Sequence, residues 1–394
     1  MWTFDSSRSD FGVSLSMTTI YDLDTPAALL DRQILTANIR RAQEVCRRLG
    51  VVWRPHLKTH KSLDVARLQT ASPAGPATVS TLKEAEYFAG AGITDLIYAV
   101  GIVPSKLPRI HAINRRGADV KVILDSVEAA EAVSRWCREN GAALRVLIEI
   151  DCDGHRSGLR PDDPAVSDVA RAIRDGAELV GVLTHAGGSY ALASEADRIR
   201  AAQNEVQAVV SVAEKLRGEG YGIRIISIGS TPTLMACQDA SGVTEIRSGV
   251  GSVGDLFMAG LGACRIGDIS LSVLVQVIGR QTEKGWLITD GGWMAMSRDR
   301  GTAKQAIDWG YGAVCDEEGR LMPDYWVSDA NQEHGIISRR DGAPIDPKEF
   351  PIGRRLRILP NHACPTGAAF DRYHAVENGT EVVGVYPRIN HWEA

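Results

Sequence analysis

The residues best suited to chemistry in this 394-residue chain lie in one short basic string. The string Arg-Pro-His-Leu-Lys-Thr-His-Lys occupies residues 54–61 and follows an apolar run at 51–53. A lysine partly buried among cationic neighbours loses its proton more readily, and a neutral amine can bond to a carbonyl carbon. Lys58 is therefore a candidate covalent anchor for a carbonyl cofactor. The string could instead be a solvated loop or an anion patch, so its position in the fold has to decide.

Two loops rich in glycine and hydroxyl groups are candidates for a phosphate site. Gly229-Ser230-Thr231-Pro232 follows a predicted strand at 223–228, and Ser248-Gly249 follows another at 244–247. Proline suits the first turn of a helix, where free backbone N–H groups and nearby hydroxyls hold a phosphate. A phosphate site facing a reactive lysine indicates pyridoxal 5'-phosphate as the cofactor.

Three further side chains also follow predicted strands. Arg156 comes after the strand at 144–150 and could hydrogen-bond an oxyanion on a cofactor ring. His185 and Tyr190 come after the strand at 179–184, in a glycine-containing segment that permits close approach of a ligand. Each of the two rings could equally be ordinary packing, so both are candidates for cofactor contact.

A second kind of chemistry is indicated near the C-terminus, where His362 and Cys364 are two residues apart. On a strand, residues with this spacing project from the same face, so we expect the imidazole and the thiolate to converge on one divalent ion. Zn²⁺ fits this ligand pair best, with Mn²⁺ or Mg²⁺ as alternatives. Two protein ligands leave positions open for substrate, although both residues could also be ordinary core or loop residues. Glu333 and His334 form another polar cluster, for which the sequence suggests no role.

The elements that must position these groups alternate between apolar runs and amphipathic helical stretches. Eight strands are expected at 51–53, 77–80, 95–100, 119–124, 144–150, 179–184, 223–228 and 244–247. Parallel strands separated by helices close into a (β/α)8 barrel, and such barrels carry their active sites at the carboxyl ends of the strands. Each candidate residue up to Gly249 lies at such an end.

Beyond residue 265 the pattern changes to short apolar alternations, as at 271–277 and 355–359, which predict a β-rich domain. We therefore expect a flexible N-terminal extension at 1–20, a cofactor-binding barrel at 21–264, and a β-rich domain with the metal site at 265–394. Residues 21–32 could belong to the β-rich domain instead. The ligand site is expected in the cleft between the two domains.

Bulk composition excludes several classes of protein. The formal net charge of −5 argues against nucleic-acid binding, which relies on a clustered basic face. No apolar run approaches the length needed to span a membrane. The seven cysteines stand singly, as expected for a protein of the reducing cytoplasm.

With these residues identified, the chain resembles the D-serine dehydratase and D-threonine aldolase family of alanine-racemase-like pyridoxal-phosphate enzymes. The resemblance runs from Asp22-Leu23-Asp24-Thr25-Pro26 to Asn361-His362-Ala363-Cys364, and the string at 54–61 is its most specific part. It implies that Lys58 forms the Schiff base and that Tyr190, Gly229 and Ser230 contact the cofactor. It further implies that Arg156 lies near the phenolic oxygen of the cofactor and Arg247 near the ring nitrogen.

The activity implied by this resemblance is dehydration of a β-hydroxy-D-amino acid to a 2-oxo acid and ammonia. Lys58 would remove the α-proton, and Zn²⁺ on His362 and Cys364 would activate the β-hydroxyl. Candidate substrates are D-serine, D-threonine and 3-hydroxy-D-aspartate. Cys364 favours dehydration, because aldolases of the family tend to carry aspartate at that position. Retro-aldol cleavage to glycine and an aldehyde is the nearest alternative, and a racemase or a non-catalytic cofactor carrier is more distant. The resemblance also implies a homodimer.

Overall fold

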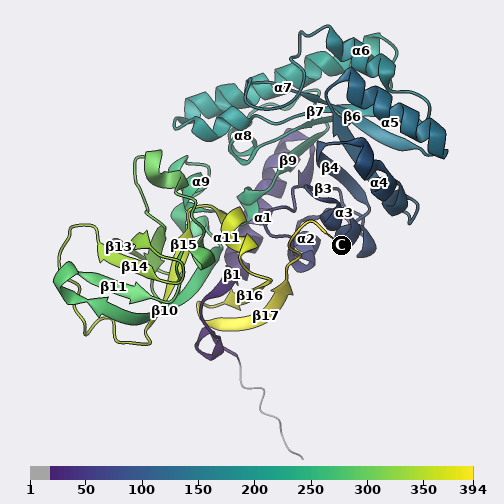
Figure 1. Ribbon diagram of the computed structural model, residues 1–394. Coiled ribbons are helices and arrows are strands. Elements are labelled where there is room, and N and C mark those ends of the chain that lie inside the picture. The colour runs from purple at the N-terminus through teal and green to yellow at the C-terminus, as the bar shows by residue number, and fades with distance from the viewer. Residues whose placement is uncertain (1–17, 394) are drawn as a thin grey trace, which may run out of the picture.

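Eight parallel strands form a barrel in the computed structural model, which describes residues 18–393 (Figure 1). Their order is β2-β9-β8-β7-β6-β5-β4-β3, and a parallel bridge between His56 and Thr78 brings β2 against β3, so the barrel is nearly closed. All eight predicted strands are present, with ends at most two residues from those expected, which confirms the predicted barrel. The strands are β2 Val52–Pro55, β3 Ala77–Val79, β4 Asp95–Gly101, β5 Asp119–Leu124, β6 Leu144–Ile150, β7 Ala177–Thr184, β8 Ile225–Ile228 and β9 Glu245–Ser248.

Helices connect these strands and cover the outside of the barrel. The first, α1 (Arg32–Leu49), buries a stripe of apolar residues and ends at Gly50, whose φ of 69° suits a residue without a side chain. The others around the barrel are α2 Leu63–Gln69, α3 Leu82–Gly90, α4 Leu107–Asn114, α5 Val127–Asn140, α6 Ala165–Ala172, α7 Glu195–Gly218 and α8 Thr231–Ala236. The short helix α9 (Leu256–Gly260) follows β9 and lies beside the β-rich domain instead (Figure 1).

Buried charged side chains link β2 to the neighbouring strand β9 inside the barrel. Arg54 on β2 donates from Nε to Glu245 on β9 at 2.8 Å and from Nη1 to Asp95 at 3.0 Å. Two residues beyond Glu245, and therefore on the same face of β9, Arg247 lies one layer closer to the carboxyl ends of the strands.

The second sheet has nine strands, in the order β11-β14-β13-β12-β15-β10-β1-β16-β17. Its pairings are antiparallel except for the parallel pair between β1 and β16, so the predicted β-rich domain is confirmed. Its strands and helices are β1 Ala27–Asp31, β10 Leu271–Gln281, β11 Trp286–Thr289, α10 Trp293–Met296, β12 Gly312–Cys315, β13 Leu321–Ala330, β14 Gly335–Arg339, β15 Arg355–Pro360, α11 Ala363–Ala368, β16 Arg372–Glu377 and β17 Glu381–Pro387.

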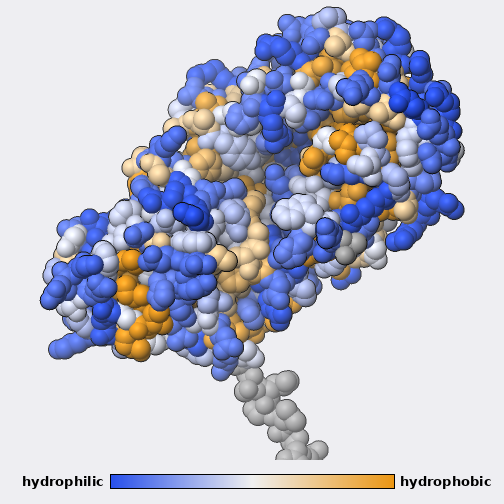
Figure 2. Space-filling view, in the orientation of Figure 1, coloured by the Kyte–Doolittle hydropathy of each residue, from blue (hydrophilic) through white to orange (hydrophobic). Residues whose placement is uncertain are grey.

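The segment before the barrel thus contributes an interior strand, β1 between β10 and β16, to the second sheet, and the chain then enters the barrel through α1. Of the predicted extension at 1–20, residues 1–17 lie outside the described residues. Ile20 is not loose, because it is fully buried in a cluster with Leu29 and Val376. Hydrophilic side chains predominate on the face shown in Figure 2. Among the described residues, no helix is both long and apolar enough to cross a bilayer.

Candidate active site between the barrel and the β-rich domain

A cavity of about 870 Å³ opens at the carboxyl ends of the barrel strands, where α11 of the β-rich domain faces it. This volume is within the range of pockets that hold a cofactor and a small substrate. The structure brings all the sequence-predicted site residues into the lining of this one cavity. They are Lys58, Arg156, His185, Tyr190, Gly229, Ser230, Thr231, Arg247, Ser248, Gly249, His362 and Cys364. Glu333 and His334 are exposed in the turn between β13 and β14 and do not line it.

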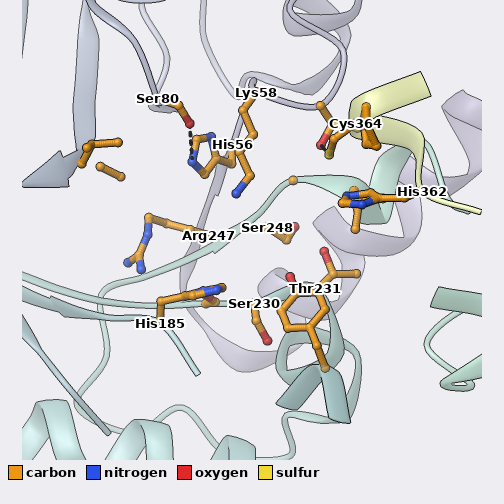
Figure 3. Close-up of a pocket in the computed structure, with 18 of the residues that line it drawn as sticks. His56, Lys58, Ser80, His185, Ser230, Thr231, Arg247, Ser248, His362 and Cys364 are labelled. Atoms are coloured by element: carbon orange, nitrogen blue, oxygen red, sulfur yellow. Dashed lines mark hydrogen bonds between the residues drawn. The ribbon is translucent and has the colours of Figure 1, made fainter. Parts of the chain in front are cut away.

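Lys58 follows β2 and extends toward the middle of the cavity (Figure 3). The expected partial burial of this lysine is wrong, because its side chain is exposed at the open end of the barrel. The Lys58 ammonium forms no ion pair with the described residues, whereas Lys61, on the same loop, is held by Glu84 at 3.0 Å. Lys58 is therefore free to bond with a ligand in the cavity.

The basic residues beside Lys58 in sequence do not all surround it in space. Arg54 points into the barrel toward Glu245 and Asp95. His60 is fully buried; its Nδ1 accepts from the Ser62 N–H at 3.1 Å, so Nε2 donates to Gln69 at 2.9 Å. The positive charge near Lys58 comes instead from Arg247 and Arg156, which line the same cavity from β9 and from the loop after β6.

The loops after β8 and β9 form one wall of the cavity, as expected for a phosphate site. Ser230 caps α8, accepting from the Thr233 N–H at 3.2 Å. Gly229 has a φ of 147°, and a Cβ there would lie 1.9 Å from the Arg247 carbonyl oxygen, so a side chain cannot be accommodated. Thr231 Oγ1 is buried, lines the cavity and has no hydrogen-bond partner among the described residues. A buried hydroxyl without a partner indicates that a ligand atom belongs beside it.

Arg247 and His185 line the site beside the Gly229 loop. Arg247 donates to Ser227 Oγ and to the Thr184 carbonyl oxygen, both at 2.5 Å, and its burial lowers the pKa of the guanidinium. His185 Nδ1 donates to the Gly229 carbonyl oxygen at 2.7 Å. Burial, together with the charges of Arg156 and Arg247, lowers the pKa of His185 to about 4, so the ring is neutral near pH 7. A neutral ring can lie against a conjugated cofactor without adding charge.

Tyr190 and Arg156 occupy the remaining barrel positions. The Tyr190 ring stacks on Phe257 at 6.4 Å between centroids with an interplanar angle of 18°, and its hydroxyl accepts a hydrogen bond from the Thr231 backbone. Arg156 is exposed in the loop after β6. Glu149 is the second-last residue of β6 and also lines the cavity. Burial raises the pKa of its carboxyl.

His362 and Cys364 face Lys58 from the β-rich domain, but the predicted strand placement is wrong. Strand β15 ends at Pro360, which has no N–H to continue the ladder, and the two residues lie instead at the cap and in the first turn of α11. The pair still converges, because a hydrogen bond links the His362 and Cys364 side chains. The Cys364 sulfur also lies 3.3 Å from the Thr59 hydroxyl.

The surroundings of this pair favour a thiolate beside an oriented imidazole. His362 Nδ1 donates to Asp299 Oδ2 at 2.8 Å, which leaves Nε2 directed away from that carboxylate. Despite burial, the bonds to Asp299 and Cys364 raise the pKa of His362 to about 10. Burial opposes ionisation of Cys364, but His362 lowers the pKa of the thiol. Within residues 18–393, no group of three or more His, Cys, Asp or Glu side chains is placed to hold a metal ion, so only these two protein ligands are offered.

Several residues of the cavity were not predicted from the sequence. His56 stands in the basic string, and its buried Nδ1 has no partner among the described residues. Asp255 accepts from the Ala363 N–H at 3.0 Å and so fixes the start of α11 against α9. Asp299 and Arg388 come from irregular segments with no motif. Of these four, only His56 carried a signal in the sequence, its place beside Lys58.

Known proteins resemble this chain over almost its whole length. The alanine racemase N-terminal domain family matches residues 30–256, and the serine dehydratase domain family matches residues 270–376. D-threo-3-hydroxyaspartate dehydratase from Delftia sp. (strain HT23) is 50% identical over 95% of this chain and 99% of its own length. The chain belongs to the D-serine dehydratase family. Its fold group is that of the alanine-racemase-like pyridoxal-phosphate enzymes.

Other members of the D-serine dehydratase family and its neighbours agree with this assignment. D-serine dehydratase from Dictyostelium discoideum is 28% identical over 95% of this chain and 98% of its own. A 3-hydroxy-D-aspartate aldolase from Paracoccus denitrificans is 27% identical, covering 93% and 92%. Among solved structures, a cysteine mutant of D-threo-3-hydroxyaspartate dehydratase in a metal-free form superposes with a TM-score of 0.93, at 49% identity over 95% of this chain and all of that one.

Proposed function

We propose that this protein is a pyridoxal-phosphate-dependent dehydratase that converts β-hydroxy-D-amino acids into a 2-oxo acid and ammonia with the help of a divalent metal ion. One observation carries the proposal: Lys58 and the His362–Cys364 pair face the same cavity, with the Cys364 sulfur 3.3 Å from the hydroxyl of the residue next to Lys58. A base for the α-proton and a site for a β-hydroxyl are therefore within reach of one small substrate. The name of the Delftia relative supports the same class of reaction.

The residues present fit pyridoxal phosphate. Thr231 Oγ1 is a buried donor without a partner among the described residues, and the glycine at 229 admits only a bare backbone at the same loop. Thr231, Ser230 and Gly249 would hold the phosphate, and Lys58 would hold the aldehyde carbon. When bound, the cofactor supplies an electron sink that acidifies the α-carbon of the substrate.

The protein's own groups then control the protons. The Lys58 amine removes the α-proton, and Arg247, held by Ser227 and Thr184, keeps its charge directed at one fixed position. His185 stays neutral and is oriented by the Gly229 carbonyl. Arg156 contributes positive charge at the cavity wall, where it stabilises an oxyanion.

His362 and Cys364 would hold the metal ion, which supplies a Lewis acid for the departing hydroxyl. We propose Zn²⁺, because an imidazole and a thiolate suit zinc better than Mn²⁺ or Mg²⁺, which prefer oxygen ligands. Asp299 orients the His362 ring through Nδ1, an arrangement common in metal-binding histidines.

Retro-aldol cleavage is the second candidate, because the Paracoccus aldolase is related over nearly the whole chain and cleavage needs the same lysine and metal ion. Product analysis distinguishes the two reactions. D-serine, D-threonine and 3-hydroxy-D-aspartate should each be incubated with the holoenzyme, with the L-enantiomers as controls. Ammonia with a 2-oxo acid supports the proposal, whereas glycine with an aldehyde as the main products would refute it.

A further inference from the structure

Arg388 is a buried cation in the wall of the cavity, and the function proposed above gives this arginine no role. It follows β17, is 7% exposed, and lines the cavity that holds Lys58 and Cys364. Its backbone N–H donates to the Asp371 carbonyl oxygen at 2.8 Å, and the next N–H, of Ile389, donates to the Lys61 carbonyl oxygen at 3.0 Å. These bonds fix the segment beside the loop that carries Lys58.

Among the described residues, the guanidinium of Arg388 donates hydrogen bonds only to uncharged groups. Nε donates to the Tyr373 hydroxyl at 2.9 Å, Nη1 donates to Asn390 Oδ1, and Nη2 lies 3.5 Å from the Thr59 carbonyl oxygen. A guanidinium carries five N–H donors, so two have no acceptor among the described residues. Burial of a charge without an opposite charge is unfavourable, and proteins normally supply a partner.

Arg54, a buried arginine of the barrel, shows what such pairing looks like. Arg54 is buried to a similar degree, and it binds two carboxylates, those of Glu245 and Asp95. Arg388 forms no ion pair with any carboxylate of residues 18–393, and because it lines the cavity, an anionic ligand bound there can supply the opposite charge. The nearby Lys61 is already paired with Glu84 and is not available for the same purpose.

The position of Arg388 indicates which part of a substrate it faces. Its Nη2 approaches the carbonyl oxygen of Thr59, and the hydroxyl of that same residue contacts the Cys364 sulfur. Arg388 therefore lies on the side of the cavity where the His362–Cys364 pair would bind the β-hydroxyl. A group attached to the β-carbon of the substrate is the one brought to this side.

We propose that Arg388 binds the side-chain carboxylate of the substrate and so selects an acidic β-hydroxy-D-amino acid, such as 3-hydroxy-D-aspartate, over D-serine. This inference rests on the proposed function for the placement of the β-carbon. Arginine suits the task because its planar fork matches a carboxylate with two parallel hydrogen bonds.

The test measures binding of two ligands that lack a β-hydroxyl and so cannot be dehydrated. D-aspartate carries the second carboxylate and D-alanine does not, and the holoenzyme is titrated with each while the absorbance of the cofactor is followed. The native protein should bind D-aspartate more tightly. In Arg388→Gln we expect D-aspartate to lose about tenfold or more in affinity, while D-alanine changes by less than about twofold.

Two further variants test whether a change in affinity arises from misfolding or from the loss of any positive charge. Arg388→Lys keeps the charge but not the fork and should lose less affinity for D-aspartate than Arg388→Gln does. Arg372→Gln removes an exposed arginine on β16, paired with Asp371, and should leave both affinities unchanged. In turnover by Arg388→Gln, we expect kcat/KM for 3-hydroxy-D-aspartate to fall and kcat/KM for D-serine to be retained.

Equal weakening of D-aspartate and D-alanine would overturn the proposal, because Arg388 would then act on the α-carboxylate or only on the fold. Unchanged affinity for D-aspartate would overturn it as well. The binding test does not depend on the reaction. If glycine and an aldehyde appeared while the D-aspartate preference still depended on Arg388, the proposed dehydration would fail and the carboxylate site would stand.

Discussion

The sulfur of Cys364 lies 3.3 Å from the hydroxyl of Thr59, so a side chain of the β-rich domain contacts the residue that follows Lys58 in the barrel. The contact joins the start of α11 to the loop after β2, two segments about 300 residues apart in sequence. In the proposed reaction, the lysine that would act at the α-carbon and the pair that would act at the β-carbon are thus held close together by direct packing. The barrel alone would lack the His362–Cys364 pair, and the β-rich domain alone would lack Lys58.

Removing the Thr231 hydroxyl, which has no hydrogen-bond partner in the part of the chain that the structure describes, should weaken cofactor binding without harming the fold. In Thr231→Val we expect the affinity for pyridoxal phosphate to fall about tenfold, the value of one hydrogen bond to a charged group. The melting temperature of the cofactor-free protein should stay the same or rise, because a buried hydroxyl without a partner is replaced by a methyl group. Fluorescence titration measures the affinity, and Thr282→Val, at an exposed site, is the control. An unchanged affinity would remove Thr231 from the phosphate site.

Asp299 should control metal binding through the orientation of His362. Asp299→Asn keeps the size of the side chain but removes the carboxylate that accepts from Nδ1. We expect the metal affinity to fall by about 10- to 100-fold, as for other supporting carboxylates. The measurement is a zinc titration of enzyme first treated with a chelator, with the exposed Asp341→Asn as the control. Equal zinc affinity in Asp299→Asn and the native protein would show that the carboxylate does not support the site.

The identity of the residue at 364 should influence which bond breaks. Replacing the thiolate by a carboxylate in Cys364→Asp gives the metal ion a harder ligand, the type expected in aldolases of the family. With 3-hydroxy-D-aspartate as substrate we expect the ratio of glycine to ammonia to rise, while total turnover falls. Chromatography of both products gives the ratio directly. A ratio identical to that of the native enzyme would show that this ligand does not determine the reaction.

Buried neutral histidines should make the fold sensitive to acid. Burial lowers the pKa values of His60 and His185 to about 4, against about 6.5 in an unfolded chain. Between these values the unfolded state binds more protons, so the free energy of unfolding falls as pH drops from 6.5 to 4 and levels off below. Each histidine contributes on the order of 3 kcal/mol.

Urea unfolding at several pH values tests this expectation. His60→Gln should flatten the pH dependence, because one titrating group is removed, whereas His334→Gln, at an exposed position, should leave it unchanged. If the slope were the same in His60→Gln and the native protein, the buried ring would not be the group that titrates.

The barrel could be predicted from the sequence because its strands are local signals, continuous apolar runs bounded by glycine, proline and polar residues. The residues after these runs were then placed correctly in one cavity by a general property of the fold. Side-chain direction was harder. Arg54 and His60 flank Lys58 in the chain, but the alternation along β2 and the turn after it direct them to Glu245 and Gln69.

The residues that the β-rich domain contributes to the cavity are positioned by tertiary contacts, which no local sequence pattern predicts. His362 and Cys364 were expected on a strand. The buried side chain of Asn361 instead forms hydrogen bonds with Thr302 and Gly310, and the chain turns into α11 at this point. Asp299 and Arg388 lie in irregular segments that are far from Lys58 in sequence, and only tertiary packing brings them to the cavity. Such residues carry no spacing rule, and their chemistry becomes visible only in the folded chain.

The proposed role of Lys58 is tested by finding the residue that bonds to pyridoxal phosphate. The holoenzyme is reduced with borohydride, digested, and the labelled peptide is sequenced by mass spectrometry. We expect a phosphopyridoxyl group on Lys58 and none on the Lys58→Ala variant, which should also lose dehydration activity. A label on Lys61, or on a lysine outside the cavity, would contradict this role.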